Sequence, residues 1–167
     1  MRYYLDTSAA VKLVRTEAES AALRTFLSPR GQVVGEPILV SSDLLQPELV
    51  GTVLRARLPL ANAMVVMRSV YLYHLSPQIC ESAGLLVGTI GARSLDALHL
   101  ATALAQRPSL TGLITYDLRL AEGAHSLGMT VVSPGHDRGS LPAPKNPAPK
   151  NPAPKNSAPE HSAHDTP

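Results

Sequence analysis

Four isolated acidic residues stand where a solvated surface charge is not expected. Asp6 ends one short apolar run and Asp117 follows another. Glu48 interrupts a stripe of leucines at helical spacing, and Asp96 opens a helical segment that is nearly free of charge. A buried carboxylate costs free energy unless a cation or hydrogen-bond donors face it. We therefore predict that the four side chains share one purpose, which is to hold a divalent metal ion.

The chemistry of these donors favours a hard cation. Four carboxylates without a cysteine and histidine set suit Mg²⁺, with Mn²⁺ as the alternative, better than zinc. Such an ion activates water and offsets charge on a phosphoryl oxygen. The sequence has no Gly-x-Gly-x-x-Gly, no Walker lysine loop and no Gly-x-Ser-x-Gly elbow, which argues against nucleotide-cofactor chemistry and serine hydrolysis. The predicted reaction is hydrolysis of a phosphodiester or a phosphomonoester.

Three of the acids, Asp6, Asp96 and Glu48, also have a purely structural interpretation. Asp6 is a suitable N-cap for a following helix. Asp96, in the first turn of its helix, would gain about 0.3–1 kcal/mol from the helix dipole. Glu48 could lie on a rotated stripe and pair at the surface with Arg55 or Arg57. These interpretations explain the acids one at a time, whereas a shared metal explains all four.

The elements that must position these acids alternate between strand and helix over residues 1–138. Ser42 and Ser94 are interpreted as helix N-caps, and Gly88 and Gly91 as part of a loop. This alternation predicts an α/β sandwich with a mostly parallel sheet. Strands are predicted at 2–5, 38–40, 71–75, 112–115 and 129–132, and helices at 8–14, 17–27, 42–57, 60–70, 77–84, 94–105 and 118–127.

The strand ends give the first indication of a common site. Ligands of parallel sheets collect beyond the carboxyl ends of the strands, so Asp6 and Asp117 are expected to project into one crevice. His99 lies one turn after Asp96 on an otherwise apolar helix. We interpret it as a core histidine and leave it outside the predicted site.

The charge and cysteine content restrict the class of protein. A formal net charge of +2 is too small to identify nucleic acid as a partner. Arginine supplies 11 of the 12 basic residues before Leu141. Its planar guanidinium suits phosphate oxygens, but a need for a soluble surface explains the arginines equally well. No apolar run approaches the roughly 20 residues that span a bilayer. The early acid argues against a signal peptide, and the single Cys80 excludes an internal disulfide. We expect a cytoplasmic protein without membrane contact.

The composition changes sharply near Gly139. The sequence Pro-Ala-Pro-Lys-Asn occurs three times between residues 142 and 156, and this end of the chain holds 8 of the 15 prolines. Such a segment lacks apolar side chains that could pack. We predict one folded domain at residues 1–138, followed by a disordered tail at 139–167 that is rich in Pro, Ala, Lys and Asn.

Four separated motifs resemble those of PIN-domain ribonucleases, in the order typical of that family. Their compact spacing is similar to that of the VapC toxin branch, over residues 2–134. The resemblance implies a PIN-like three-layer α/β/α sandwich with a mostly parallel central sheet of about five strands. The motifs are Tyr4-Leu5-Asp6-Thr7-Ser8-Ala9, the mid-chain Glu48, Arg93-Ser94-Leu95-Asp96-Ala97-Leu98-His99-Leu100-Ala101 and Ile114-Thr115-Tyr116-Asp117.

The same resemblance implies a role for each acid. Asp6 and Asp96 correspond to the chief metal ligands of the family, and the metal is typically Mg²⁺. Glu48 corresponds to a ligand or a water-orienting base. Asp117 corresponds to a ligand that often acts through water. The four acids are therefore expected to be both the catalytic and the metal-binding residues.

Supporting residues and partners also follow from the resemblance. The hydroxyls of Thr7 and Thr115 would support the ligands, and Arg93 is a candidate phosphate contact or a brace for the acids. VapC toxins are typically Mg²⁺-dependent endoribonucleases that form homodimers and are inhibited by a VapB antitoxin. We expect such a toxin acting on RNA. The alternatives are an RNA-processing PIN nuclease without an antitoxin and a PIN-like module that binds RNA or protein without cleaving.

Overall fold

A parallel five-stranded sheet forms the centre of the structure, a computed structural model that describes residues 1–29 and 36–136. The predicted tail at 139–167 and its boundary at 138 lie outside the described residues. All neighbouring strands run parallel, in the order β3-β2-β1-β4-β5. The strands are β1 (Arg2–Leu5), β2 (Ile38–Ser42), β3 (Val70–Tyr73), β4 (Gly112–Ile114) and β5 (Val131–Val132).

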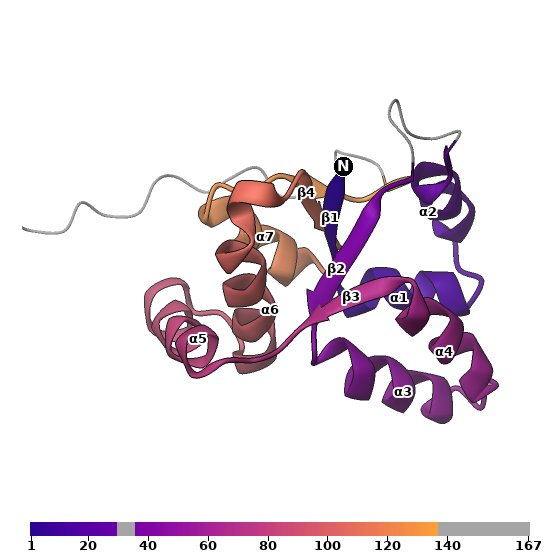
Figure 1. Ribbon diagram of the computed structural model, residues 1–167, viewed down its shortest axis with the longest axis horizontal. Coiled ribbons are helices and arrows are strands. Elements are labelled where there is room, and N and C mark those ends of the chain that lie inside the picture. Colours follow the sequence, from indigo (N-terminus) through magenta and orange to yellow (C-terminus); the bar gives the residue numbers. More distant parts are fainter. Residues whose placement is uncertain (30–35, 137–167) are drawn as a thin grey trace, which may run out of the picture.

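Helices cover both faces of this sheet. Figure 1 shows α1 to α4 on one side of the strands and α5 to α7 on the other. The predicted three-layer α/β/α architecture with a parallel sheet is confirmed. None of the helices in the described ranges combines the length and the apolar character that crossing a bilayer requires. The helices are α1 (Thr7–Val14), α2 (Ser20–Leu27), α3 (Leu45–Arg55), α4 (Leu60–Arg68), α5 (Pro77–Ile90), α6 (Ser94–Ala105) and α7 (Leu118–Ser126), with a 3-10 turn, η2 (Arg107–Ser109).

The central strand β1 contributes to both hydrophobic cores. Successive side chains of a strand point to opposite faces of the sheet. Tyr3 and Leu5 accordingly pack into the core beneath α1 to α4, whereas Tyr4 packs into the core beneath α5 to α7. Burial of such a side chain is worth about 1.5–3 kcal/mol. Strand β1 is therefore fixed from both sides, and so is the residue that follows it.

The strand order places a crevice beside β1. The chain passes from β1 to β2 on one side and later returns to β4 on the other side. Ligand sites of open α/β sheets form at such a switch point, beyond the carboxyl ends of the strands. The backbone N–H of Asp6 bonds to the carbonyl of Ile114 at 3.0 Å, which ties the end of β1 to the end of β4.

Three predicted helix starts were wrong. Helix α2 begins at Ser20 and not at residue 17. Ser42 is the last residue of β2, paired in register with Tyr73, and α3 begins only at Leu45. The side chain of Ser42 is buried and bonds inside the fold, so it cannot cap the helix. At the start of α6 the N-cap is Arg93, and Ser94 is already the first helical residue.

The loop predicted at Gly88 is helical. Helix α5 continues through Gly88 and ends at Gly91, which has a positive φ of 66°. Its inner face keeps helical spacing, with Ala83 and Leu86 buried and Ile90 packed against the same core. Apolar packing along this face outweighs the cost of an internal glycine, which is about 1 kcal/mol.

Candidate active site

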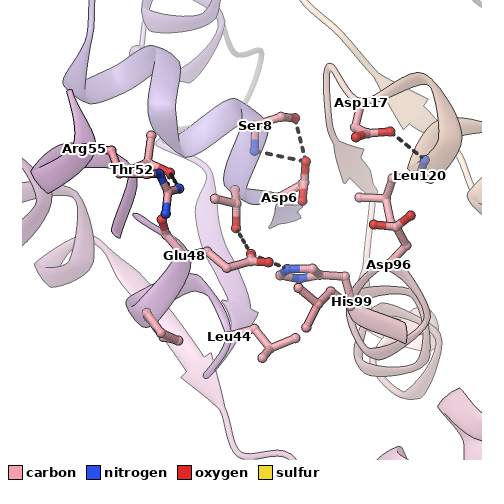
Figure 2. A pocket seen from close by; sticks show the side chains of 13 residues that line it. Asp6, Ser8, Leu44, Glu48, Thr52, Arg55, Asp96, His99, Asp117 and Leu120 are labelled. Atoms are coloured by element: carbon pink, nitrogen blue, oxygen red, sulfur yellow. Dashed lines mark hydrogen bonds and ion pairs between the residues drawn. The ribbon is translucent and has the colours of Figure 1, made fainter. Parts of the chain in front are cut away.

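An open pocket of about 540 Å³ lies beyond the carboxyl ends of β1 and β4. Its lining includes all four acids singled out in the sequence, and Figure 2 shows them arranged around it. They reach the pocket from four different elements. Asp6 follows β1, Glu48 belongs to α3, Asp96 to the first turn of α6, and Asp117 to the start of α7. The structure therefore brings the four carboxylates together, and their catalytic roles remain predictions.

Asp6 is at once a helix cap and a pocket residue. It is 5% exposed and is the N-cap of α1. Three donors bond to its Oδ2 atom: the Ser8 N–H at 3.1 Å, the Ser8 hydroxyl at 2.5 Å and the Thr115 hydroxyl at 2.9 Å. None of the described residues donates to the other oxygen, Oδ1. The interpretation of Asp6 as a helix N-cap was therefore correct, but the cap and the Thr115 contact use only Oδ2 of the carboxylate.

Asp117 repeats this arrangement at the end of β4. It is the N-cap of α7, and its Oδ1 accepts the backbone N–H groups of Arg119 at 2.8 Å and Leu120 at 3.1 Å. Its own N–H donates to the Thr115 hydroxyl at 3.0 Å. Thr115 thus connects Asp117 to Asp6, and its predicted role in supporting the metal ligands stays a prediction.

Glu48 faces the pocket beside the buried stripe of α3. Its side chain is 25% exposed, and its Oε2 accepts hydrogen bonds from the Thr7 hydroxyl and from His99 Nε2, the latter at 2.9 Å. No ion pair joins it to Arg55 or Arg57 in the described part of the chain. The surface-pair interpretation of Glu48 is therefore wrong. Its second oxygen, Oε1, receives no hydrogen bond from any described residue.

Asp96 is the acid with the least support. No described side chain or backbone N–H donates a hydrogen bond to its carboxylate. Burial raises the pKa of Asp96, and the negative charges of Asp117 and Asp6 raise it further. The nearby positive charges of Arg93 and His99 only partly oppose these effects. A cation in the pocket would relieve this repulsion most strongly at Asp96.

His99 belongs to the site, although its apolar neighbours in the sequence predicted a core residue outside it. It is 3% exposed, as expected of a core histidine, yet it lines the pocket and bonds to Glu48. The available signal was its spacing, because residues three apart on a helix share one face. His99 therefore lies on the same side of α6 as Asp96, and its apolar surroundings concealed this.

The pair formed by His99 and Glu48 shifts both pKa values. Burial lowers the pKa of His99, but the hydrogen bond to Glu48 and the charge of Asp6 outweigh burial and leave the pKa raised. Burial also raises the pKa of Glu48, yet the hydrogen bonds from His99 and Thr7 leave it lowered. Glu48 is therefore an anion at neutral pH.

Arg55, rather than the predicted Arg93, lines the pocket. Arg93 is exposed at the N-cap of α6 and is not among the lining residues. The Arg55 guanidinium donates to the Thr52 hydroxyl at 3.1 Å and lies beside Gly51, where a Cβ atom would stand 3.2 Å from Nη1. No carboxylate forms an ion pair with Arg55 among residues 1–29 and 36–136. The pocket therefore has an acidic part and one arginine that is free to meet an anion.

The donor set of the pocket fits a hard divalent cation. Each of Asp6, Glu48 and Asp117 is anchored through one oxygen and leaves the other without a described donor, and Asp96 leaves both. Carboxylate oxygens are the ligands that Mg²⁺ prefers. In the described part of the chain, no three acidic, histidine or cysteine side chains already form a metal-binding group. An ion would therefore have to draw the free oxygens together.

Comparison with known proteins adds independent information. The family model of the PIN domain matches residues 3–125. "Ribonuclease VapC35" of Mycobacterium tuberculosis is 38% identical over 139 residues, which cover 81% of this chain and 98% of the relative. Solved structures also share the fold, and two examples follow. A Mycobacterium tuberculosis VapC20, described as a Sarcin-Ricin loop cleaving toxin, aligns with a TM-score of 0.60 at 16% identity, over 79% of this chain and 99% of its own. A toxin-antitoxin complex from Klebsiella pneumoniae aligns with a TM-score of 0.56 at 20% identity, over 79% and 97%.

Proposed function

Because the chain belongs to the PIN-domain family, we propose that it is a VapC-type toxin, an endoribonuclease that hydrolyses the phosphodiester bonds of RNA with the help of Mg²⁺. The observation that carries the proposal is the group of four carboxylates, each presenting at least one free oxygen to a single pocket. A relative named as a ribonuclease, aligned over most of both chains, supports the same activity.

The metal would be held by the four acids. Asp6, Asp96, Glu48 and Asp117 would bind Mg²⁺, with Mn²⁺ as a plausible substitute, through the oxygens that the fold leaves free. A divalent ion at this position supplies Lewis-acid stabilisation of the charge that develops on the phosphate. The anchored oxygens hold the side chains of Asp6, Glu48 and Asp117 in place, so these three lose little conformational entropy when the ion binds, whereas Asp96 has no such anchor.

Glu48 is suited to orient the attacking water. Its lowered pKa keeps it ionised, and its free Oε1 can accept a hydrogen bond from a water molecule in the pocket. The oxygen of that water forms a bond to phosphorus and its proton is released to solvent, while the bond from phosphorus to the departing ribose oxygen breaks and that oxygen takes up a proton from solvent. Thr7 and His99 hold the opposite oxygen, so the acceptor atom cannot turn away from the pocket.

Arg55 would bind a phosphate of the RNA strand. It lines the pocket, has no described carboxylate partner, and its planar guanidinium can form two hydrogen bonds with one phosphate. Arg55→Leu should weaken RNA binding and reduce the salt dependence of the binding constant by about 0.7 log units per log unit of salt. Arg68→Leu is the matched control, because Arg68 is exposed in the last turn of α4 and does not line the pocket. Equal salt dependence of the natural and Arg55→Leu proteins would rule out this contact.

The activity itself has a direct test. The purified chain is incubated with total cellular RNA and Mg²⁺, and the 5′ ends of the products are mapped. Discrete new ends that disappear with EDTA are expected. RNA that is bound but stays intact would instead indicate a PIN-like binding module. Specific cleavage by a chain without a neighbouring antitoxin gene would indicate an RNA-processing nuclease.

We extend the proposal to partners and place of action. A VapB-type antitoxin would insert a basic side chain among the acids, and the Klebsiella pneumoniae neighbour is a toxin-antitoxin complex. The packed helices α3 and α4 expose Leu54, Met64 and Val65, apolar side chains that a protein partner could cover. We propose a homodimer that acts in the cytoplasm, where its RNA substrate is found. Co-purification with the product of the adjacent gene and light scattering of the free protein test these points.

A further inference from the structure

A buried polar chain reaches Glu48 from inside the fold. His99 Nδ1 lies 2.8 Å from the Tyr4 hydroxyl and 3.3 Å from the Ser42 hydroxyl, and His99 Nε2 lies 2.9 Å from Glu48 Oε2. Tyr4 and Ser42 are fully buried and His99 is nearly so. Buried polar groups are costly unless each is matched by a partner, and every member of this chain is matched.

The contacts of the Tyr4 hydroxyl fix the direction of the hydrogen bonds. The backbone N–H of Ser42 donates to the Tyr4 oxygen at 3.2 Å, so the hydrogen of the phenol is available to His99 Nδ1. Burial raises the pKa of Tyr4, which keeps the phenol protonated. A neutral His99 that accepts at Nδ1 carries its hydrogen on Nε2. A charged His99 carries hydrogens on both nitrogens. In either state Nε2–H donates to Glu48.

These contacts give the two carboxylate oxygens of Glu48 different surroundings. The Thr7 hydroxyl, from α1, and His99 Nε2, from α6, both donate to Oε2. These two helices lie on opposite faces of the sheet, so the carboxylate is held from both sides of the fold (Figure 1). Figure 2 shows the His99 ring directed at the Glu48 carboxylate. The consequence is that Oε1, with no described donor, is the oxygen left for the pocket.

We propose that His99, held in turn by Tyr4, is a positioning residue that sets the divalent-ion affinity of the pocket by fixing the orientation of Glu48. The proposal rests on the proposed function for the identity of the ion, but its geometry concerns only residues of this chain. His99 itself touches neither RNA nor the reacting phosphate. If His99 only filled the core, its replacement would change stability and leave ion affinity unchanged.

The experiment measures Mn²⁺ binding to the full chain without RNA, by calorimetry, beside a thermal melt of each variant. His99→Leu keeps an apolar filling but removes the donor, and we expect Mn²⁺ affinity to fall about tenfold, as for other groups that orient a metal ligand. His99→Gln places an N–H near the position of Nε2 and should restore most of the affinity. Tyr4→Phe should give a smaller loss. His74→Leu is the matched control, because His74 pairs with Asp43 at 2.7 Å on the exposed surface.

The outcomes separate this proposal from the proposed function. Natural affinity in a folded His99→Leu protein, or equal loss in His99→Leu and His99→Gln, overturns the positioning role. If His99→Leu does not fold, Thr7→Val and Tyr4→Phe still test whether loosening Oε2 weakens Mn²⁺ binding, and unchanged affinity in both overturns it. If the natural protein and its variants bind Mn²⁺ with affinities in the expected order, but the natural protein does not cleave RNA, the nuclease activity is refuted and the positioning role of His99 stands. A natural protein that binds no Mn²⁺ refutes both.

Discussion

Helix α1 separates two groups of carboxylates with opposite surroundings. At its last turn, the ammonium of the buried Lys12 lies 2.9 Å from Glu17 and 2.6 Å from Glu19, and 4.7 Å from the ring centre of Tyr116. The pocket lies at the first residue of α1. Within residues 1–29 and 36–136, no lysine or arginine forms an ion pair with the four acids that line it. Asp6 and its pocket neighbours are held only by hydroxyls, backbone N–H groups and one histidine.

Glu17 and Glu19 beside Lys12 therefore stabilise the fold, whereas repulsion among the four pocket acids destabilises it. A carboxylate beside a buried ammonium gains from the pair, and removal of the cation leaves it uncompensated. Carboxylates that crowd one another without a cation cost stability, and such costs are usually found at functional sites. The raised pKa of Asp96, caused by burial and then by Asp117 and Asp6, is the sign of this cost.

The largest expected effect comes from neutralising one pocket acid. Asp6→Asn or Asp96→Asn should lower Mg²⁺-dependent RNA cleavage by about a thousandfold, because Lewis-acid stabilisation is worth several kcal/mol. Circular dichroism should show an intact fold. Glu19→Gln, in the paired group, is the matched control and should leave the cleavage rate unchanged. Undiminished cleavage by a folded Asp6→Asn or Asp96→Asn protein contradicts the assignment of the site.

Divalent ions should stabilise the natural protein through the pocket alone. At a hundredfold excess over its Kd, Mg²⁺ should raise the free energy of unfolding by about 2.7 kcal/mol, and EDTA should reverse the gain. Urea unfolding with and without Mg²⁺ measures it. Asp96→Asn should lose most of this gain, whereas Lys12→Met should keep it. A gain of equal size in Asp96→Asn would show that the ion binds elsewhere.

Loss of the cation in the paired group should affect stability rather than chemistry. Lys12→Met should lower the free energy of unfolding by about 1–3 kcal/mol, between the values for exposed and buried pairs. In a Glu17→Gln/Glu19→Gln background, Lys12→Met should lower the free energy of unfolding by less, because the two replaced side chains carry no charge to be compensated. This double-mutant cycle isolates the pair. A cost independent of the background would mean that Lys12 acts only by packing on Tyr116.

The smallest effect is a contrast in pH dependence. The hydrogen bond from Lys12 is the main cause that lowers the pKa of Glu19, so its stabilisation is present above the ordinary glutamate pKa and is lost as pH falls through the lowered value. The pKa of Asp96 is raised, so its charge opposes folding at neutral pH, and this cost is removed as pH falls through the raised value.

Denaturant unfolding between neutral pH and pH 3 measures this contrast. Lys12→Met should be less stable than the natural protein at neutral pH, and Asp96→Asn should be more stable by less than about 1 kcal/mol. Both differences should shrink on acidification. Differences of the same sign would remove the distinction between the two groups of acids.

The sequence predicted the strand-end half of the site well. Asp6 and Asp117 follow short buried runs, and strand ends of a parallel sheet converge whatever the details of the helices. Asp96 was placed correctly because its helix is nearly uncharged. The orientation of Glu48 depended on how α3 rotates against the core, because a rotated stripe of leucines would have placed Glu48 at the surface beside Arg55 or Arg57. Only the packing of Leu45, Leu49 and Val53 inward resolved it.

What the sequence did not predict depends on contacts distant along the chain. His99 resembles a core residue until Tyr4 and Glu48, which are 95 and 51 positions away, are placed against its two nitrogens. Ser42 reads as a helix cap until its register with Tyr73 extends β2. Arg55 in the last turn of α3 lines the pocket and Arg93 at the N-cap of α6 does not, which depends on how these two helices are placed around the sheet. Local propensity contains none of these relations.

The one-sided anchoring of Asp6 has a practical consequence for its amide variant. Because Oδ2 accepts one N–H and two hydroxyl hydrogens, the carbonyl oxygen of an asparagine must occupy that position. The NH₂ group is then directed into the pocket and offers hydrogens in place of a lone pair. An Asp6→Asn chain should therefore hold an RNA phosphate without cutting it. Sequencing the RNA retained on this immobilised variant would reveal the natural target as captured, uncut molecules.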